Sequence, residues 1–195
     1  MPDDLPELVV SDLAGWRSWL GEHAEQPTGV WLVLAKKGTV EPTSLTYDEA
    51  LEESLCHGWI DGQVRGRDAA TYLQRFTPRR ARSPWSRRNV GIVARLIEEG
   101  RMQPRGLAEV ERARGDGRWD AAYPGPASAE VPDDLAAALD AVPAAKDRFG
   151  RLTSQNRYAV IYRVTQAKRP ETRARRVADL VAMLARGETP YPQKG

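Results

Sequence analysis

The chain has 195 residues, of which 41% are hydrophobic and 29% charged, and its formal net charge is +2. This length suffices for one good core or two small domains, and the near-neutral charge argues against non-specific binding to nucleic acid. The single cysteine excludes an intramolecular disulfide, and two histidines give little basis for a zinc site.

The first predicted elements are a helix, a strand and a second helix. Residues 12–25 show the spacing of a helix, and the apolar run at 30–36, bounded by glycines, predicts a strand buried on both faces. Thr46 and Glu49 match a capping box, so a helix is expected to begin there. It should end near Gly58, which can adopt the left-handed conformation.

A β-hairpin is predicted next, with strands at 59–65 and 71–77 around a turn at 66–68. Polar and apolar residues alternate in its first strand, so one face is apolar and the other polar. The sequence does not fix the register. A one-residue slip decides whether Asp61 faces Gln74 or Arg75.

Two helices should follow at about 84–99 and 104–114, and the last helix begins at Pro170. The predicted fold class is α+β: a small, mainly antiparallel sheet packed by helices, followed by a helical C-terminal part. The predicted boundaries are 1–118 for the α+β part, 119–131 for an irregular tether and 132–195 for the helical part, packed together as one compact unit. The predicted interface between the two parts consists of Tyr158, Ile161, Val177, Leu180 and Leu184.

The segment 75–89 carries the strongest chemical signal, because six arginines lie next to a predicted helix start. Ser83 is a good N-cap and Pro84 a good first helical residue. Guanidinium groups at the positive end of a helix favour an anionic ligand. The alternative is a solvated arginine loop with Asn89 as a satisfied polar core residue. The predicted ligand-binding residues are Trp59, Arg75, Thr77, Arg79, Arg80, Trp85, Ser86 and Asn89.

Three residues at the junction of the second helix and the hairpin are candidates for catalysis. Cys56 is more typical of a small buried hydrophobe. His57 and Asp61 are the candidates for acid/base catalysis if the protein is an enzyme. Asp61 has a structural alternative, since a carboxylate within a strand needs water or a partner and several arginines are candidate partners. The chain has no Walker loop, GxGxxG, GxSxG or HExxH motif, so we expect neither cofactor nor metal.

A series of short motifs runs through the chain in a fixed order. They are Cys56–Asp61, Arg75–Arg80, Ser83, Trp85–Ser86, Asn89, Gly100–Met102, Gly117–Tyr123, Val131–Pro132, Asn156–Tyr158 and Ala167–Arg173. Over roughly residues 12–190 this series resembles the YdeI/OmpD-associated family, also labelled bacteriocin-protection proteins. The resemblance implies a bacterial cytoplasmic protein of protection from antimicrobial peptides or toxic compounds. It implies no settled reaction or cofactor. The family often has another residue where this chain has His57.

Two functions follow as hypotheses. The first is a protection or resistance protein that binds a small anionic molecule, a peptide or a partner in a cleft lined by arginine and tryptophan. The second is a small-molecule enzyme of antibiotic resistance or biosynthesis, with Asp61 or His57 as acid/base and arginines stabilising negative charge. No apolar run reaches the roughly 18 residues of a membrane span, and the N-terminus does not resemble a signal peptide, so a cytoplasmic location is expected. The oligomeric state stays open.

Overall fold

The computed structural model describes residues 5–23, 25–125 and 129–193. The chain divides into two compact units, 1–123 and 124–195, each with its own hydrophobic core. The division follows Tyr123 rather than residue 118, because the backbone of Tyr123 bonds to residues 85 and 87 of the first unit. Residues 1–4, on which the expectation about a signal peptide rests, and 126–128 of the predicted tether lie outside the described residues.

The first unit contains a four-stranded mixed sheet in the order β1-β2-β4-β3. The strands are β1 (Glu7–Leu8), β2 (Val30–Ala35), β3 (Trp59–Gly66) and β4 (Thr71–Pro78). Strand β2 pairs in parallel with β1 and antiparallel with β4, and β3 and β4 form the predicted hairpin. The α+β class with a mainly antiparallel sheet is thus confirmed. The two-residue strand β1 was not expected from the sequence.

The hairpin register differs from both predicted alternatives. Asp61 pairs with Phe76, whereas Val64 pairs with Gln74, because the register shifts between Asp61 and Val64. Such a bulge inserts an extra residue on one strand and alters the local twist. The hairpin therefore has two registers, one on each side of the bulge, and not a single register along its whole length.

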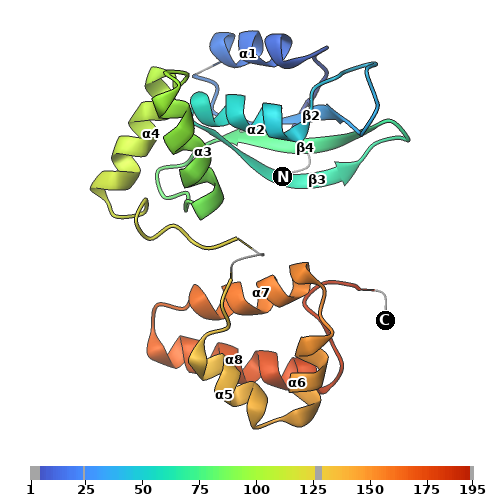
Figure 1. Cartoon of the computed structure of the whole chain (residues 1–195), viewed down its shortest axis with the longest axis vertical. Coiled ribbons are helices and arrows are strands. Elements are labelled where there is room, and N and C mark those ends of the chain that lie inside the picture. Colours follow the sequence, from blue (N-terminus) through green and yellow to red (C-terminus); the bar gives the residue numbers. More distant parts are fainter. Residues whose placement is uncertain (1–4, 24, 126–128, 194–195) are drawn as a thin grey trace. The chain divides into compact units, whose positions relative to one another are not determined.

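Helices cover one face of the sheet (Figure 1). Helices α1 (Leu13–Glu22) and α2 (Tyr47–Cys56) lie on this face, and α3 (Arg87–Glu98) and α4 (Pro104–Gly115) follow the hairpin. On the helix side, β2 contributes Val30, Leu32 and Leu34 to the main core. On the other side, Trp31 and Val33 are also buried, which confirms that β2 is buried on both faces.

Helix α3 begins three residues later than predicted. Its N-cap is Ser86, whose hydroxyl accepts a hydrogen bond from the Asn89 backbone N–H at 3.1 Å. The preceding residues are held in an extended conformation, because Trp85 and Arg87 exchange backbone hydrogen bonds with Tyr123. The Ser83 hydroxyl instead accepts from the Arg80 N–H and closes a turn.

The second unit consists of helices α5 (Asp133–Asp140), α6 (Pro143–Gly150), α7 (Ser154–Thr165) and α8 (Pro170–Ala185). Ile161, Val177, Leu180 and Leu184 are buried within this unit's own core, and Tyr158 is half-buried. Packing among the four helices accounts for the burial of the first four. An interface of these residues with the first unit, and the packing of both parts as one compact unit, stay predictions.

Candidate functional site

A basic pocket of about 480 Å³ lies where β4 ends. Its walls come from the segment before β1, the loop before β2, the end of β4 and the first turn of α4. Among the residues that the structure describes, ten line the pocket, of which four are arginines and none is acidic. We call this site the arginine pocket; its lining residues are Leu5, Pro27, Thr28, Gly29, Arg75, Thr77, Pro78, Arg79, Arg80 and Arg105.

Glycines let the walls of the arginine pocket approach one another. Gly58 has a φ of +74°, which disfavours other residues, and its carbonyl accepts the Arg79 N–H at 3.0 Å. A Cβ added to Gly106 would lie 2.1 Å from the Cys56 carbonyl oxygen, so α4 packs directly against the end of α2. This close approach places Arg105, in the first turn of α4, beside Gly58 and in the pocket wall.

Arg79 is the most unusual residue of the site, because its side chain is charged and the residue is only 6% exposed. Its guanidinium lies 3.6 Å from the centroid of the Trp85 ring, and its Nη1 donates to the Pro84 carbonyl at 3.3 Å. Its Nε and Nη2 are buried and have no hydrogen-bond acceptor among the described residues. Burial lowers the pKa of Arg79 to about 10, against the opposing influence of nearby acidic groups, of which Glu109 is the strongest.

Glu109 does not serve as a dedicated counter-ion for Arg79. Its carboxylate accepts a hydrogen bond from Arg112 at 2.8 Å. Two further arginines of the pocket also carry a buried nitrogen without an acceptor among the described residues, namely Nε of Arg75 and Nη1 of Arg105. The arginine pocket therefore concentrates positive charge that the carboxylates of the described residues neutralise only in part.

A second pocket of about 280 Å³ adjoins the first. The two share Arg75, Thr77, Pro78 and Arg80, so these residues form the boundary between them. The second pocket adds uncharged polar groups to the boundary. We call it the Gln63 pocket; its lining residues are Gly62, Gln63, Arg75, Thr77, Pro78, Arg80 and Ser83.

Four of the predicted ligand-binding residues lie together in the lining of the arginine pocket, and the other four lie outside this lining. Arg75, Thr77, Arg79 and Arg80 line the arginine pocket, as does Arg105, which the sequence analysis missed. Arg105 is 25 residues from Arg80 in the sequence, and only the packing of α4 against Gly58 brings it near. No local sequence pattern gives this proximity.

The other four predicted residues are buried in the core or cap a helix. Trp59 is fully buried in the core and contacts Trp16 and Trp19 edge to face. Trp85 is buried beneath Arg79, Ser86 caps α3 and Asn89 is buried in α3. None of Trp59, Trp85, Ser86 and Asn89 lines the arginine pocket, which lies at the end of β4 and the first turn of α4. The ligand-binding role expected of these four residues stays a prediction.

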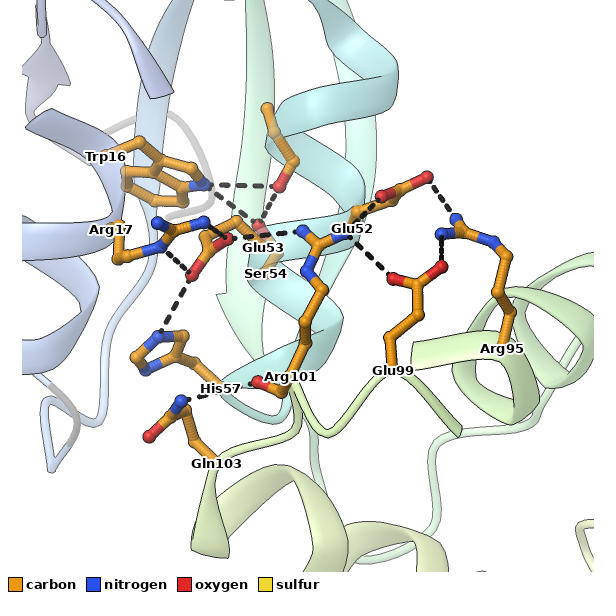
Figure 2. Close-up of polar contacts among 11 residues, drawn as sticks. Trp16, Arg17, Glu52, Glu53, Ser54, His57, Arg95, Glu99, Arg101 and Gln103 are labelled. Carbon is orange, nitrogen blue, oxygen red and sulfur yellow. Dashed lines mark hydrogen bonds and ion pairs between the residues drawn. The ribbon is translucent and has the colours of Figure 1, made fainter. Parts of the chain in front are cut away.

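His57 belongs to an ionic cluster around Glu53 (Figure 2). The His57 Nε2 lies 3.6 Å from Glu53 Oε1, and Arg17 binds both oxygens of this carboxylate at 2.9 Å. Arg101 approaches Glu53 at 3.6 Å. Burial alone would raise the pKa of Glu53, but its contacts with His57 and Arg17 lower it to about 2. Glu53 therefore holds a buried negative charge next to the guanidinium groups of Arg17 and Arg101.

The ionic cluster extends from α2 to α3 and the turn after it. Arg101 bonds to Glu52 at 3.0 Å, and Arg95 contacts both Glu52 and Glu99. Figure 2 shows the cluster as a continuous chain from Arg17 to Arg95. These pairs join α1, α2 and α3. His57 thus lies in a structural network and does not line the arginine pocket.

Asp61 is held by a separate set of contacts. It accepts a hydrogen bond from the Tyr47 hydroxyl at 3.0 Å, and Arg88 donates to the same hydroxyl at 3.3 Å. Arg88 also pairs with Asp48 at 2.8 Å. Burial, then the charge of Asp61, raises the pKa of Tyr47 to about 12. Asp61 therefore links β3 to α2 through Tyr47, and it too is absent from the pocket lining.

The remaining chemical candidates have little support from their surroundings. Cys56 is fully buried, and burial raises the pKa of its thiol to about 11, which opposes formation of a nucleophilic thiolate. Within residues 5–23, 25–125 and 129–193, no group of three or more His, Cys, Asp or Glu side chains is placed to hold a metal ion. In the same part of the chain, no helix has both the length and the apolar character needed to cross a membrane.

Each of the two parts of the chain matches a known family model. Residues 8–109 match the family model described as Domain of unknown function (DUF8412). The chain belongs to the DUF8412 family. Within this DUF8412 protein, residues 128–187 match a second model, described as Bacteriocin-protection, YdeI or OmpD-Associated. This second match confirms the resemblance noted from the motifs, over a shorter region than the motifs span.

The two matches divide the DUF8412 protein much as its structure does. Nine of the ten residues that line the arginine pocket fall within 8–109, and Leu5 lies just before this region. Searches of curated proteins and of solved structures found no match.

Proposed function

We propose that the first unit binds a small anionic molecule in the arginine pocket, and that the chain is a bacterial cytoplasmic protein of the protection or resistance type. The observation that carries the proposal is Arg79, a buried guanidinium in the pocket wall with two nitrogens that lack an acceptor among the described residues. Removing a charge from water is costly unless the charge is paired and hydrogen-bonded. An anion in the pocket would supply that pairing.

The composition of the pocket supports an anion over a cationic or neutral ligand. Arg75, Arg79, Arg80 and Arg105 line it, and none of the other described lining residues is acidic. Guanidinium groups bind carboxylate and phosphate oxygens in a bidentate manner. The volume of about 480 Å³ also falls in the range typical of small-molecule sites.

The protective role rests on a different observation. The family model that matches residues 128–187 has bacteriocin protection in its description. Binding of an anionic toxic compound, or of a metabolite that signals its presence, is compatible with such a role. The structure offers no comparable support for the enzyme hypothesis, because His57 and Asp61 are engaged with Glu53 and Tyr47 and neither lines the arginine pocket.

Calorimetric titration with inorganic phosphate and with citrate, at low ionic strength, tests the binding proposal. The test variant is Arg75→Ala/Arg80→Ala, which removes two charges from the pocket wall. The matched control is Arg82→Ala/Arg87→Ala, which removes two exposed arginines outside the lining. We expect the test variant to lose at least about tenfold in affinity and the control to lose little beyond long-range screening effects. Absence of binding by the wild type, or equal losses in both variants, contradicts the proposal.

A further inference from the structure

The two adjoining pockets differ in chemistry although they share a boundary. Arg79 and Arg105 face only the arginine pocket, whereas Gln63 and Ser83 face only the Gln63 pocket. One side of the boundary is therefore strongly cationic. The other side combines the shared arginines with an amide and a hydroxyl. A single ligand that crosses the boundary would need one anionic end and one uncharged polar end.

The cationic end fits a phosphoryl group better than a carboxylate. A phosphate monoester carries close to two negative charges at neutral pH and has three strong acceptor oxygens. A carboxylate carries one charge and has two oxygens. Since four guanidinium groups line the arginine pocket, a dianion with three oxygens satisfies more of their donors and offsets more of their charge.

The uncharged end fits hydroxyl groups. Gln63 accepts from Arg75 Nη1 through its side-chain oxygen at 3.0 Å, which leaves its amide N–H groups as donors. The Ser83 hydroxyl accepts from the Arg80 N–H at 3.0 Å and retains its own proton for donation. Thr77 adds a third uncharged polar group at the boundary. Ligand hydroxyls both donate and accept, so they match amide and hydroxyl partners.

We propose that the ligand is a phosphate monoester of a small polyhydroxylated compound, with its phosphate in the arginine pocket and its hydroxyl groups in the Gln63 pocket. This proposal rests on the proposed function and narrows it to one class of anion. The combined site extends over both cavities, of about 480 and 280 Å³, and so has room for more than an inorganic anion. The same geometry assigns Gln63 and Ser83 as specificity-determining residues.

The test is calorimetric titration with four probes: inorganic phosphate, ribose 5-phosphate, ribonate and ribose. Ribonate keeps a sugar-derived polyol chain but carries a carboxylate, and ribose has no anionic group. We expect ribose 5-phosphate to bind about tenfold more tightly than inorganic phosphate or ribonate, and ribose to bind weakest. A Gln63→Ala/Ser83→Ala variant should lower the ratio of the ribose 5-phosphate to the phosphate affinity toward one. The ratio is the readout because a general change at Arg75 or Arg80 affects both affinities.

The outcomes separate this proposal from the one on which it rests. If inorganic phosphate binds and ribose 5-phosphate binds no better, the assignment of the Gln63 pocket is overturned and the anion site stands. If ribonate binds as tightly as ribose 5-phosphate, the phosphoryl class is overturned. An unchanged affinity ratio in a folded Gln63→Ala/Ser83→Ala variant removes these two residues from the site. If no anionic probe binds, the proposed function fails together with this inference.

Discussion

The guanidinium of Arg79 lies 3.6 Å from the ring centroid of Trp85, so a wall of the arginine pocket rests on the hydrophobic core. Trp85 is itself buried, and its ring contacts Trp119 at 4.9 Å between centroids. A cation over an indole face is attracted by the ring quadrupole, and this attraction is stronger where water is excluded. The stacked pair therefore fixes the orientation of Arg79 before any ligand arrives.

The first prediction follows from this pair. Replacing Trp85 by Ala should lower the free energy of unfolding by about 3–5 kcal/mol, because it leaves a large cavity under Arg79 and beside Trp119. The change is measured by urea denaturation. Trp85→Phe is the matched control, since it keeps an aromatic face for the guanidinium and should cost less. Equal midpoints for the wild type and the alanine variant would contradict the buried position of the ring.

A second prediction concerns the contact that places Arg105. Gly106→Ala should destabilise the protein, although alanine is normally favoured in a helix, because its Cβ would lie 2.1 Å from the Cys56 carbonyl oxygen. Gly91→Ala is the control. Gly91 is also helical, but an added Cβ there has nothing within 4 Å, so that variant should gain about 0.5–1 kcal/mol. Thermal melting of both variants measures the difference, and stabilisation by Gly106→Ala would show that α4 does not approach α2 this closely.

Local patterns in the sequence predicted most of the elements. The capping residue Thr46, the turn at Gly58 and the helix start at Pro170 are local signals, and the structure has elements at these places. Helix α3 begins later than predicted because its first residue depends on a contact with a residue far along the chain. Tyr123 pairs with the backbone on both sides of Ser86 and keeps it extended, and no property of residues 83–86 indicates this partner.

For the candidate site too, the sequence indicates only the residues that are near one another along the chain. The segment 75–80 is rich in arginine and is therefore recognisable in the sequence. Arg105 joins the arginines of this segment only through the packing of α4 against Gly58. Trp59 and Trp85 are near these arginines in the sequence, but both side chains are buried in the core and do not line the pocket.

The third prediction uses the pH dependence of the Glu53 cluster. The pKa of Glu53 is lowered from 4.5 to about 2 in the folded protein, so its ionised form favours the folded state. This contribution is complete above about pH 4.5 and is lost as the pH falls toward 2. Glu53→Gln should therefore destabilise the protein by about 2 kcal/mol at pH 7 and by about half as much or less at pH 3.

Urea denaturation of the Glu53→Gln variant and the wild type at several pH values measures this effect. Glu111→Gln is the control, since Glu111 is exposed on α4. It should shift the midpoint little at any pH. If the difference in free energy of unfolding between the wild type and Glu53→Gln stays constant from pH 7 to 3, the negative charge of Glu53 does not contribute to stability.

The last prediction concerns two separate effects of Arg79: its effect on the stability of the protein and its contribution to anion binding. Arg79→Met keeps an unbranched side chain over Trp85 but removes the buried charge. Burial of a charge without an ion-pair partner costs free energy, and a hydrophobic side chain of similar length avoids this cost. Without ligand, the variant should therefore be at least as stable as the wild type within about 1 kcal/mol, even though the Pro84 carbonyl loses a donor.

The contrast with a paired arginine makes this prediction specific. Arg17→Met removes both hydrogen bonds from Arg17 to the buried Glu53 carboxylate, so it should destabilise the protein clearly. Arg79→Met removes an arginine that has a carbonyl and an aromatic ring as contacts but no carboxylate within hydrogen-bonding distance among the described residues. Phosphate should raise the melting temperature of the wild type and of Arg17→Met, because a ligand of the native state stabilises it, and should leave Arg79→Met unchanged. If Arg79→Met is as destabilising as Arg17→Met and still responds to phosphate, Arg79 supports the fold and does not bind the anion.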